Sequence, residues 1–142
     1  LPVWLAWEVF GGGNGCVNRK EMEARLEAIR TRPELKASLW ANATRLHDGL
    51  SAAGYELAAP VSPVIAVRVP SREAGARIWN ALMEQGVYVN LVLPPAAPEG
   101  AALLRCSLSA AHSFDQIDTI IAAFKTVAPE AATGTAQSTA AQ

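Results

Sequence analysis

Residues 86–112 limit the possible folds more than any other stretch of this sequence. Two runs rich in apolar and β-branched residues, 87–93 and 103–109, are separated by a turn that contains Pro94, Pro95 and Pro98. Two such runs around a proline-rich turn predict a β-hairpin. A helix is expected directly after it, because Ser113 and Gln116 have the spacing of a capping box.

Arg105 lies in the middle of the second predicted strand. Because successive side chains of a strand point to opposite faces, the alternation places Leu104, Cys106 and Leu108 on one face and Leu103, Arg105, Ser107 and Ser109 on the other. Such an arginine can simply face water on a half-exposed sheet. Alternatively, its planar guanidinium, held on a rigid strand beside a proline loop, can bind a carboxylate through two parallel hydrogen bonds. The spacing alone does not choose between these readings.

The length and composition predict one ordinary globular domain or a piece of a larger protein. The chain has 142 residues, is 51% hydrophobic and carries a formal net charge of −1, so no basic surplus indicates nucleic-acid binding. Cys16 and Cys106 lack metal-ligand spacing, so we predict no metal site and a reducing, cytoplasmic setting. No run is apolar enough to predict a transmembrane segment. The start at Leu1 is expected of a C-terminal fragment, although a processed N-terminus would look the same.

The rest of the chain divides into three parts. We expect a divergent or linker segment at 1–20, because its glycine cluster lacks a phosphate-binding fingerprint, then a domain at 21–128 and a disordered tail at 129–142. Within the domain, periodicity and capping signals predict helices at 19–30, 34–53, 71–85 and from 114, strands at 64–70, 87–93 and 103–109, and a loop at 55–63. This order favours an α+β fold, with a three-stranded, mainly antiparallel sheet covered on one face by helices.

Several motifs resemble the C-terminal domain of the α-oxoamine synthases, and most closely the bacterial serine palmitoyltransferase branch. They are Gly-Val-Tyr-Val-Asn at 86–90, Leu-Pro-Pro-Ala-Ala-Pro at 93–98 and Leu-Leu-Arg-Cys-Ser-Leu-Ser-Ala-Ala-His at 103–112. The most specific part is the Arg-x-Ser-x-Ser-Ala-Ala-His run that begins at Arg105.

The resemblance implies a small C-terminal domain of a fold-type I enzyme that depends on pyridoxal 5'-phosphate. Such an enzyme is a homodimer that condenses an amino acid, here L-serine, with an acyl-CoA and releases carbon dioxide, as in sphingolipid biosynthesis. It also implies that Arg105 receives the amino-acid carboxylate and that Asn90, Pro94, Pro95 and Ala97 belong to a mobile substrate-binding loop. Ala97 departs from the family pattern, which usually has threonine there.

The resemblance implies no catalytic residue within this chain. Lys20, Lys36 and Lys125 have the wrong neighbours for the lysine that bonds to the cofactor, so we expect the chain not to hold the cofactor covalently and not to be catalytically self-sufficient. Two alternatives stay open. One is a fragment of an enzyme like 8-amino-7-oxononanoate synthase or glycine acetyltransferase. The other is a non-catalytic interaction or regulatory domain.

Overall fold

The computed structural model describes residues 19–97 and 101–132. In chain order the elements are α2 (Arg19–Thr31), α3 (Pro33–Ala52), β1 (Glu56–Leu57), β2 (Val64–Val69), α4 (Arg72–Glu84), β3 (Asn90–Val92), β4 (Ala102–Ser107) and α5 (Phe114–Ala132). No helix among these residues is both long enough and apolar enough to cross a membrane.

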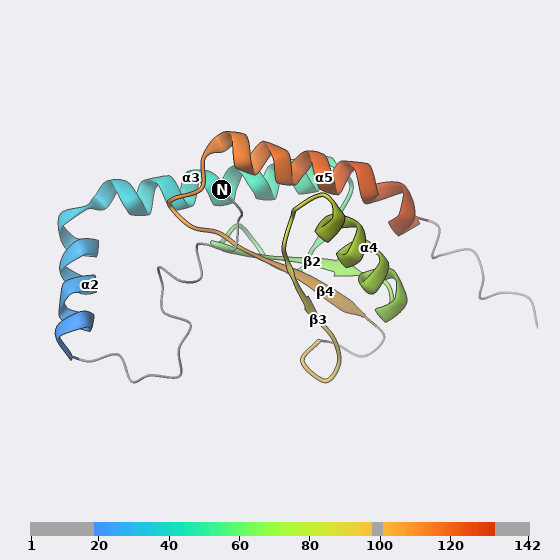
Figure 1. Ribbon diagram of the computed structural model, residues 1–142, viewed down its shortest axis with the longest axis horizontal. Helices are drawn as coiled ribbons and strands as arrows, with labels where there is room; N and C mark the ends of the chain where they lie inside the picture. The colour runs from blue at the N-terminus through green and yellow to red at the C-terminus, as the bar shows by residue number, and fades with distance from the viewer. Residues whose placement is uncertain (1–18, 98–100, 133–142) are drawn as a thin grey trace, which may run out of the picture.

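The strands form one antiparallel sheet with the order β1-β2-β4-β3 (Figure 1). Strands β3 and β4 pair directly, which confirms the predicted hairpin and the α+β class. The predicted count of three strands is wrong, because Glu56 and Leu57 pair with Arg68 and Val67 at the edge of β2. Two residues are too few to show a period in sequence, so this edge was predicted as part of a loop.

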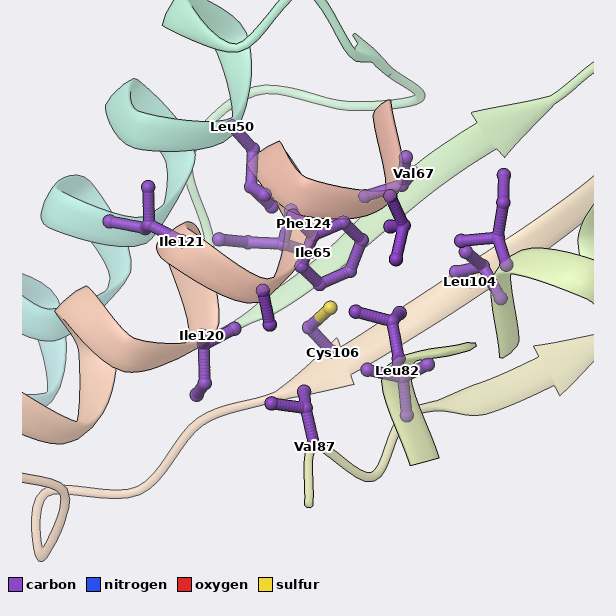
Figure 2. Close-up of a cluster of buried hydrophobic side chains, with 14 of the residues drawn as sticks. Leu50, Ile65, Val67, Leu82, Val87, Leu104, Cys106, Ile120, Ile121 and Phe124 are labelled. Carbon is purple, nitrogen blue, oxygen red and sulfur yellow. The ribbon is translucent and has the colours of Figure 1, made fainter. Parts of the chain in front are cut away.

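Helices α3, α4 and α5 cover one face of the sheet (Figure 1). Apolar residues of these helices meet the inward side chains of β2 and β4, and the labelled side chains in Figure 2 gather in this layer. Among the fully buried side chains are Leu46, Ile78, Leu104, Ile117 and Phe124. Burying a side chain of this size stabilises a fold by about 1.5–3 kcal/mol, so this layer is the main source of stability.

The helix ends follow the chemistry expected from the sequence. Pro33 begins α3, and Gly54 adopts a φ of 87° just after it, in the left-handed region that glycine tolerates. The Ser71 hydroxyl accepts a hydrogen bond from the Ala74 amide at 3.1 Å. The capping box is also confirmed: the Ser113 amide donates to the Gln116 side chain at 2.9 Å, and the Gln116 amide donates to the Ser113 hydroxyl at 3.3 Å.

Three predicted boundaries need correction. Strand β3 begins at Asn90 rather than Val87, and β4 ends at Ser107 rather than Ser109. Helix α5 continues through Ala132, so the first four residues of the predicted tail are helical. The remainder of that tail and nearly all of the predicted segment at 1–20 lie outside the described residues, so the division into parts stays a prediction.

Asn42 joins α3 to the connection between β4 and α5. It is a buried polar residue of α3, and its side-chain amide donates to the Ser109 carbonyl at 3.0 Å and to the His112 carbonyl at 2.8 Å. The Ser109 amide in turn donates to Nδ1 of His112 at 3.0 Å. These contacts fix the turn that follows β4.

We expect Asn42→Ala to lower the free energy of unfolding by about 2 kcal/mol, because it leaves two backbone carbonyls without their donor. Urea denaturation measures this change. Thr44→Ala, at an exposed position of the same helix, is the matched control. An equal effect of both substitutions would contradict the assigned role of Asn42.

Tyr55 joins the middle of α5 to the loop after α3. Its hydroxyl donates to the Phe124 carbonyl at 2.7 Å, and its ring meets the Phe124 ring edge-on, with centroids 5.3 Å apart. Partial burial raises the pKa of the Tyr55 phenol to about 12. The folded protein therefore favours the neutral phenol.

Tyr55→Phe should lower the free energy of unfolding by about 1 kcal/mol near neutral pH, through the lost hydrogen bond. Because the folded pKa lies above the ordinary value of 10, the stabilisation is fully present below pH 10 and is lost as the pH rises toward 12. The stability difference between wild type and Tyr55→Phe should therefore shrink over this interval. A difference that stays constant from pH 9 to 12 would contradict this explanation.

Candidate functional site

The face of the sheet opposite the helices carries the predicted site, and we call it the open face. Cross-strand pairing and alternation assign to it Glu56 of β1, Val64, Ala66 and Arg68 of β2, Leu103, Arg105 and Ser107 of β4, and Asn90 and Val92 of β3. The described helices leave this face uncovered (Figure 1).

Arg105 lies at the centre of this face, on an inner strand. Asn90 of β3 is its direct partner on one side and Ala66 of β2 on the other. Residues directly opposite in antiparallel strands have Cβ atoms about 5 Å apart, so the Asn90 amide and the Arg105 guanidinium emerge side by side. The structure thus brings together two of the predicted site residues.

Arg68 lies on the same face, and unlike Arg105 it has an acidic partner on the adjacent strand. Its Nε lies 3.0 Å from Oε1 of Glu56, the residue directly opposite on β1. Arg105 is exposed, and no acidic side chain within 19–97 or 101–127 forms an ion pair with it. Its neighbours on the adjacent strands, Asn90 and Ala66, carry no charge. The guanidinium is therefore available to an external anion, and a carboxylate matches its planar fork.

The proline loop follows shortly after β3, the strand that carries Asn90. The amides of Ala96 and Ala97 both donate to the Leu93 carbonyl, at 3.0 and 3.2 Å, and the bond between Pro94 and Pro95 is cis. Pro94 and Pro95 are exposed, whereas Ala97 is only 6% exposed. Ala97 presents a buried methyl group, so it offers no hydroxyl to a ligand.

A shallow depression touches this loop but not Arg105. Its volume is about 290 Å³, and it is lined by Ser71, Arg72, Glu73, Pro94 and Ala101. Neither Asn90 nor Arg105 borders it, so this depression does not join the two predicted halves of the site, the loop and the strand pair.

Trp79 supports the site from the helix side, and sequence reasoning missed it. Its indole nitrogen donates to the carbonyl of Val89 at 2.8 Å, immediately before Asn90. Val87 and Val89 are buried in the core, so this segment is held although it lies outside the ladder with β4. The sequence did contain a signal for this contact, because Trp79 lies beside the apolar stripe of its helix. A buried indole N–H needs a hydrogen-bond acceptor, so such a tryptophan indicates a polar contact with a neighbouring element.

Trp79→Phe should keep most of the ring volume while removing the donor to Val89. We expect backbone amides of β3 to exchange with solvent about 5- to 30-fold faster, because losing a hydrogen bond costs about 1–2 kcal/mol. Hydrogen exchange read by NMR measures this. The control is Trp40→Phe, at an exposed position on α3. Unchanged exchange in Trp79→Phe would show that the indole does not hold the strand.

The three lysines and Cys106 do not supply a covalent centre at this site. Lys20, Lys36 and Lys125 are exposed on α2, α3 and α5, none of which carries the open face. Cys106 points into the core, and burial raises the pKa of its thiol to about 12, which keeps it protonated and unreactive. No cluster of metal-ligating side chains occurs in the part of the chain that is described.

His112 has a structural role. Its Nδ1 accepts a hydrogen bond from the Ser109 amide at 3.0 Å, which requires the neutral ring. Burial lowers the pKa of His112 and so favours the same neutral form. The histidine therefore stabilises the turn after β4 and belongs to the scaffold.

Comparison with known families and proteins gives consistent matches. The sequence model of the family described as aminotransferase class I and II matches residues 20–124. Serine palmitoyltransferase of Caulobacter vibrioides is 45% identical over 96 residues, which cover 68% of this chain and 24% of that protein. An 8-amino-7-oxononanoate synthase of Anaeromyxobacter dehalogenans is 35% identical over 107 residues, which cover 75% of this chain and 27% of that protein.

Solved structures agree with these matches. Serine palmitoyltransferase of Sphingomonas wittichii superposes with a TM-score of 0.67 and 39% identity, over 70% of this chain and 26% of that one. A high-resolution structure of serine palmitoyltransferase with PLP internal aldimine gives a TM-score of 0.71 and 38% identity, over 74% of this chain and 27% of that one. The chain thus spans about a quarter of the length of the relatives it matches.

Proposed function

Because this chain belongs to the class I and II aminotransferase family, in which it matches the α-oxoamine synthases, we propose that it is the substrate-binding part of a serine palmitoyltransferase-like acyltransferase. The complete enzyme would condense L-serine with an acyl-CoA and release carbon dioxide, in sphingolipid biosynthesis. We include homodimeric assembly and a cytoplasmic location in this proposal. The observation that carries it is the exposed Arg105 guanidinium, which lies beside Asn90 without an acidic partner in the described residues.

The geometry suits recognition of a small amino acid. A guanidinium can form two parallel hydrogen bonds with a carboxylate, and the strand holds its Cα at a fixed place in the sheet. The Asn90 amide beside it supplies a further polar contact for the same ligand. Holding the carboxylate fixes the orientation of the amino acid, and that is the contribution we assign to this chain.

The cofactor of the family does not fit the residues present. Pyridoxal 5'-phosphate is bound covalently through a lysine, and the three lysines of this sequence lie on helices away from the open face. We therefore assign cofactor binding to residues that this chain does not contain. The roles of Pro94, Pro95 and Ala97 as a mobile loop remain part of the proposal, supported by the position of the loop next to β3.

A second candidate is an enzyme like 8-amino-7-oxononanoate synthase, favoured by the Anaeromyxobacter match over 75% of the chain. Both candidates need a carboxylate-binding arginine at Arg105 and differ in the amino acid and the thioester used. An assay of substrate preference therefore distinguishes the two candidates.

The test uses a chimera that joins the unmatched part of the Caulobacter enzyme to this chain at Lys20, where the family match begins. In the chimera loaded with pyridoxal 5'-phosphate, Arg105→Lys should raise the KM for L-serine about 10-fold or more, because lysine keeps the charge but cannot form the two-point contact. Release of free CoA thiol from palmitoyl-CoA measures the rate.

Arg77→Lys is the matched control, because this arginine is exposed on α4, away from the open face. An equal KM for L-serine in wild type and Arg105→Lys, at equal cofactor loading, would contradict the assignment of Arg105. Formation of 8-amino-7-oxononanoate, with a different amino acid and thioester preferred over L-serine and palmitoyl-CoA, would favour the second candidate.

A further inference from the structure

A hollow lies between the first half of α3 and the turn that joins β4 to α5, and we call it the α3 hollow. Its volume is about 460 Å³, which is within the range of sites that hold small molecules. Asn42 of α3 ties the turn to the helix through its two hydrogen bonds, so both walls are held in place. None of the lining residues belongs to the open face, so this hollow is separate from the site around Arg105.

Asn42 and His112 both line the α3 hollow, and each keeps one polar group free. The side-chain nitrogen of Asn42 donates to two backbone carbonyls, whereas its side-chain oxygen Oδ1 has no hydrogen-bond partner among the described residues. Nδ1 of His112 accepts from the Ser109 amide, so the proton of the neutral ring is on Nε2. That N–H also lacks a partner within 19–97 and 101–132. The hollow therefore offers one acceptor and one donor.

The free oxygen of Asn42 is the feature that points to a ligand. Asn42 is only 2% exposed, yet it borders the hollow. Buried polar side-chain atoms nearly always have a hydrogen-bond partner, because leaving one unpaired costs free energy. A donor placed in the hollow would recover that cost.

The rest of the lining is uncharged and mostly apolar. Ala37, Ala41 and Ala110 contribute methyl groups, and Phe114 contributes a ring that is 50% exposed. Ser38 adds an exposed hydroxyl, which can donate or accept and therefore does not select between ligands. Small methyl groups beside an aromatic ring leave room for a flat apolar group.

The Phe114 wall is held although it is exposed. The guanidinium carbon of Arg45 lies 4.9 Å from the centroid of the Phe114 ring, within the range of a cation–π contact. Arg45 also donates two hydrogen bonds of 2.7 Å to the carboxylate of Asp118. These contacts fix the ring and pair the charges next to it, so the hollow carries no free charge of its own.

We propose that the α3 hollow binds a small, flat, neutral molecule whose amide has its N–H and C=O on one edge, such as the primary carboxamide of an aromatic ring. The N–H donates to Oδ1 of Asn42, the C=O accepts from Nε2 of His112, and the ring lies against the methyl groups and Phe114. A carboxylate has no donor for Asn42, and an ammonium has no acceptor for His112. The uncharged lining also disfavours both ions, because neither would find a counter-charge.

Benzamide is the probe, and NMR of the backbone amides of the intact 142-residue chain follows its binding. We expect saturable shifts confined to α3 and to residues 109–114, with about millimolar affinity for a ligand of this size. Acetophenone is the matched control ligand, because it keeps the ring and the C=O and has a methyl group in place of the NH₂. Acetophenone and benzoate should each bind about 10-fold more weakly or worse, since neither can donate to Asn42.

Ala41→Leu tests the place of binding, because a leucine side chain at this exposed position of α3 would occupy the hollow. It should weaken benzamide binding about 10-fold or more. Ala52→Leu is the matched control, since Ala52 is exposed on the same helix and does not line the hollow, and it should leave the affinity unchanged.

Three results would overturn the proposal. They are equal binding of benzamide and acetophenone, shifts that stay linear with benzamide concentration, and an unchanged affinity in Ala41→Leu. The comparison of ligands uses the wild-type chain, so it remains decisive even if a leucine variant fails to fold.

Discussion

Two arginines point to the same side of the sheet, and only one of them is neutralised. Arg68 lies opposite Glu56 on the neighbouring strand, with its Nε 3.0 Å from Oε1 of Glu56, so its charge is neutralised within the sheet. Arg105 lies between Asn90 and Ala66, neither of which can neutralise a charge. A guanidinium without a counter-charge is costly to cover with protein unless an anion comes with it. The functional interpretation of the domain depends on this difference between Arg68, which has an acidic partner, and Arg105, which has none among the described side chains.

The remainder of the described fold keeps the strand pair in position. Helices α3, α4 and α5 bury the opposite face of the sheet, so β4 cannot rotate without exposing Leu104 and Cys106. Asn42 fixes the turn that follows β4, and Trp79 fixes the segment that precedes β3. Each end of the site is therefore tied to a different helix. A site on paired strands with such supports is positioned more accurately than one on a loop.

The sequence predicted the parts of this arrangement that depend on local periodicity. The alternation around Arg105 placed it opposite the core face because Leu104 and Cys106 had to be buried, and helix caps such as Ser71 and Ser113 were recognisable from their spacing. Contacts between distant residues could not be predicted in the same way. The pairing of Glu56 with Arg68, the donation from Trp79 to Val89 and the amide contacts of Asn42 all depend on which elements become neighbours in space. The exposure of Met22, Leu26 and Ile29 on α2 is a similar case, since a helical period shows which side of a helix is apolar but not what covers it.

The central claim is that the Arg105 guanidinium binds a carboxylate on the open face. The most direct measurement follows the side-chain Nε–H signals of the arginines by NMR while N-acetyl-L-serine is added to the intact chain, with sodium chloride at matched ionic strength as the reference. We expect the Arg105 signal to shift with about millimolar affinity, while the Arg68 signal, already paired with Glu56, stays in place. A titration in which Arg105 does not respond, or responds equally to chloride, would contradict the account.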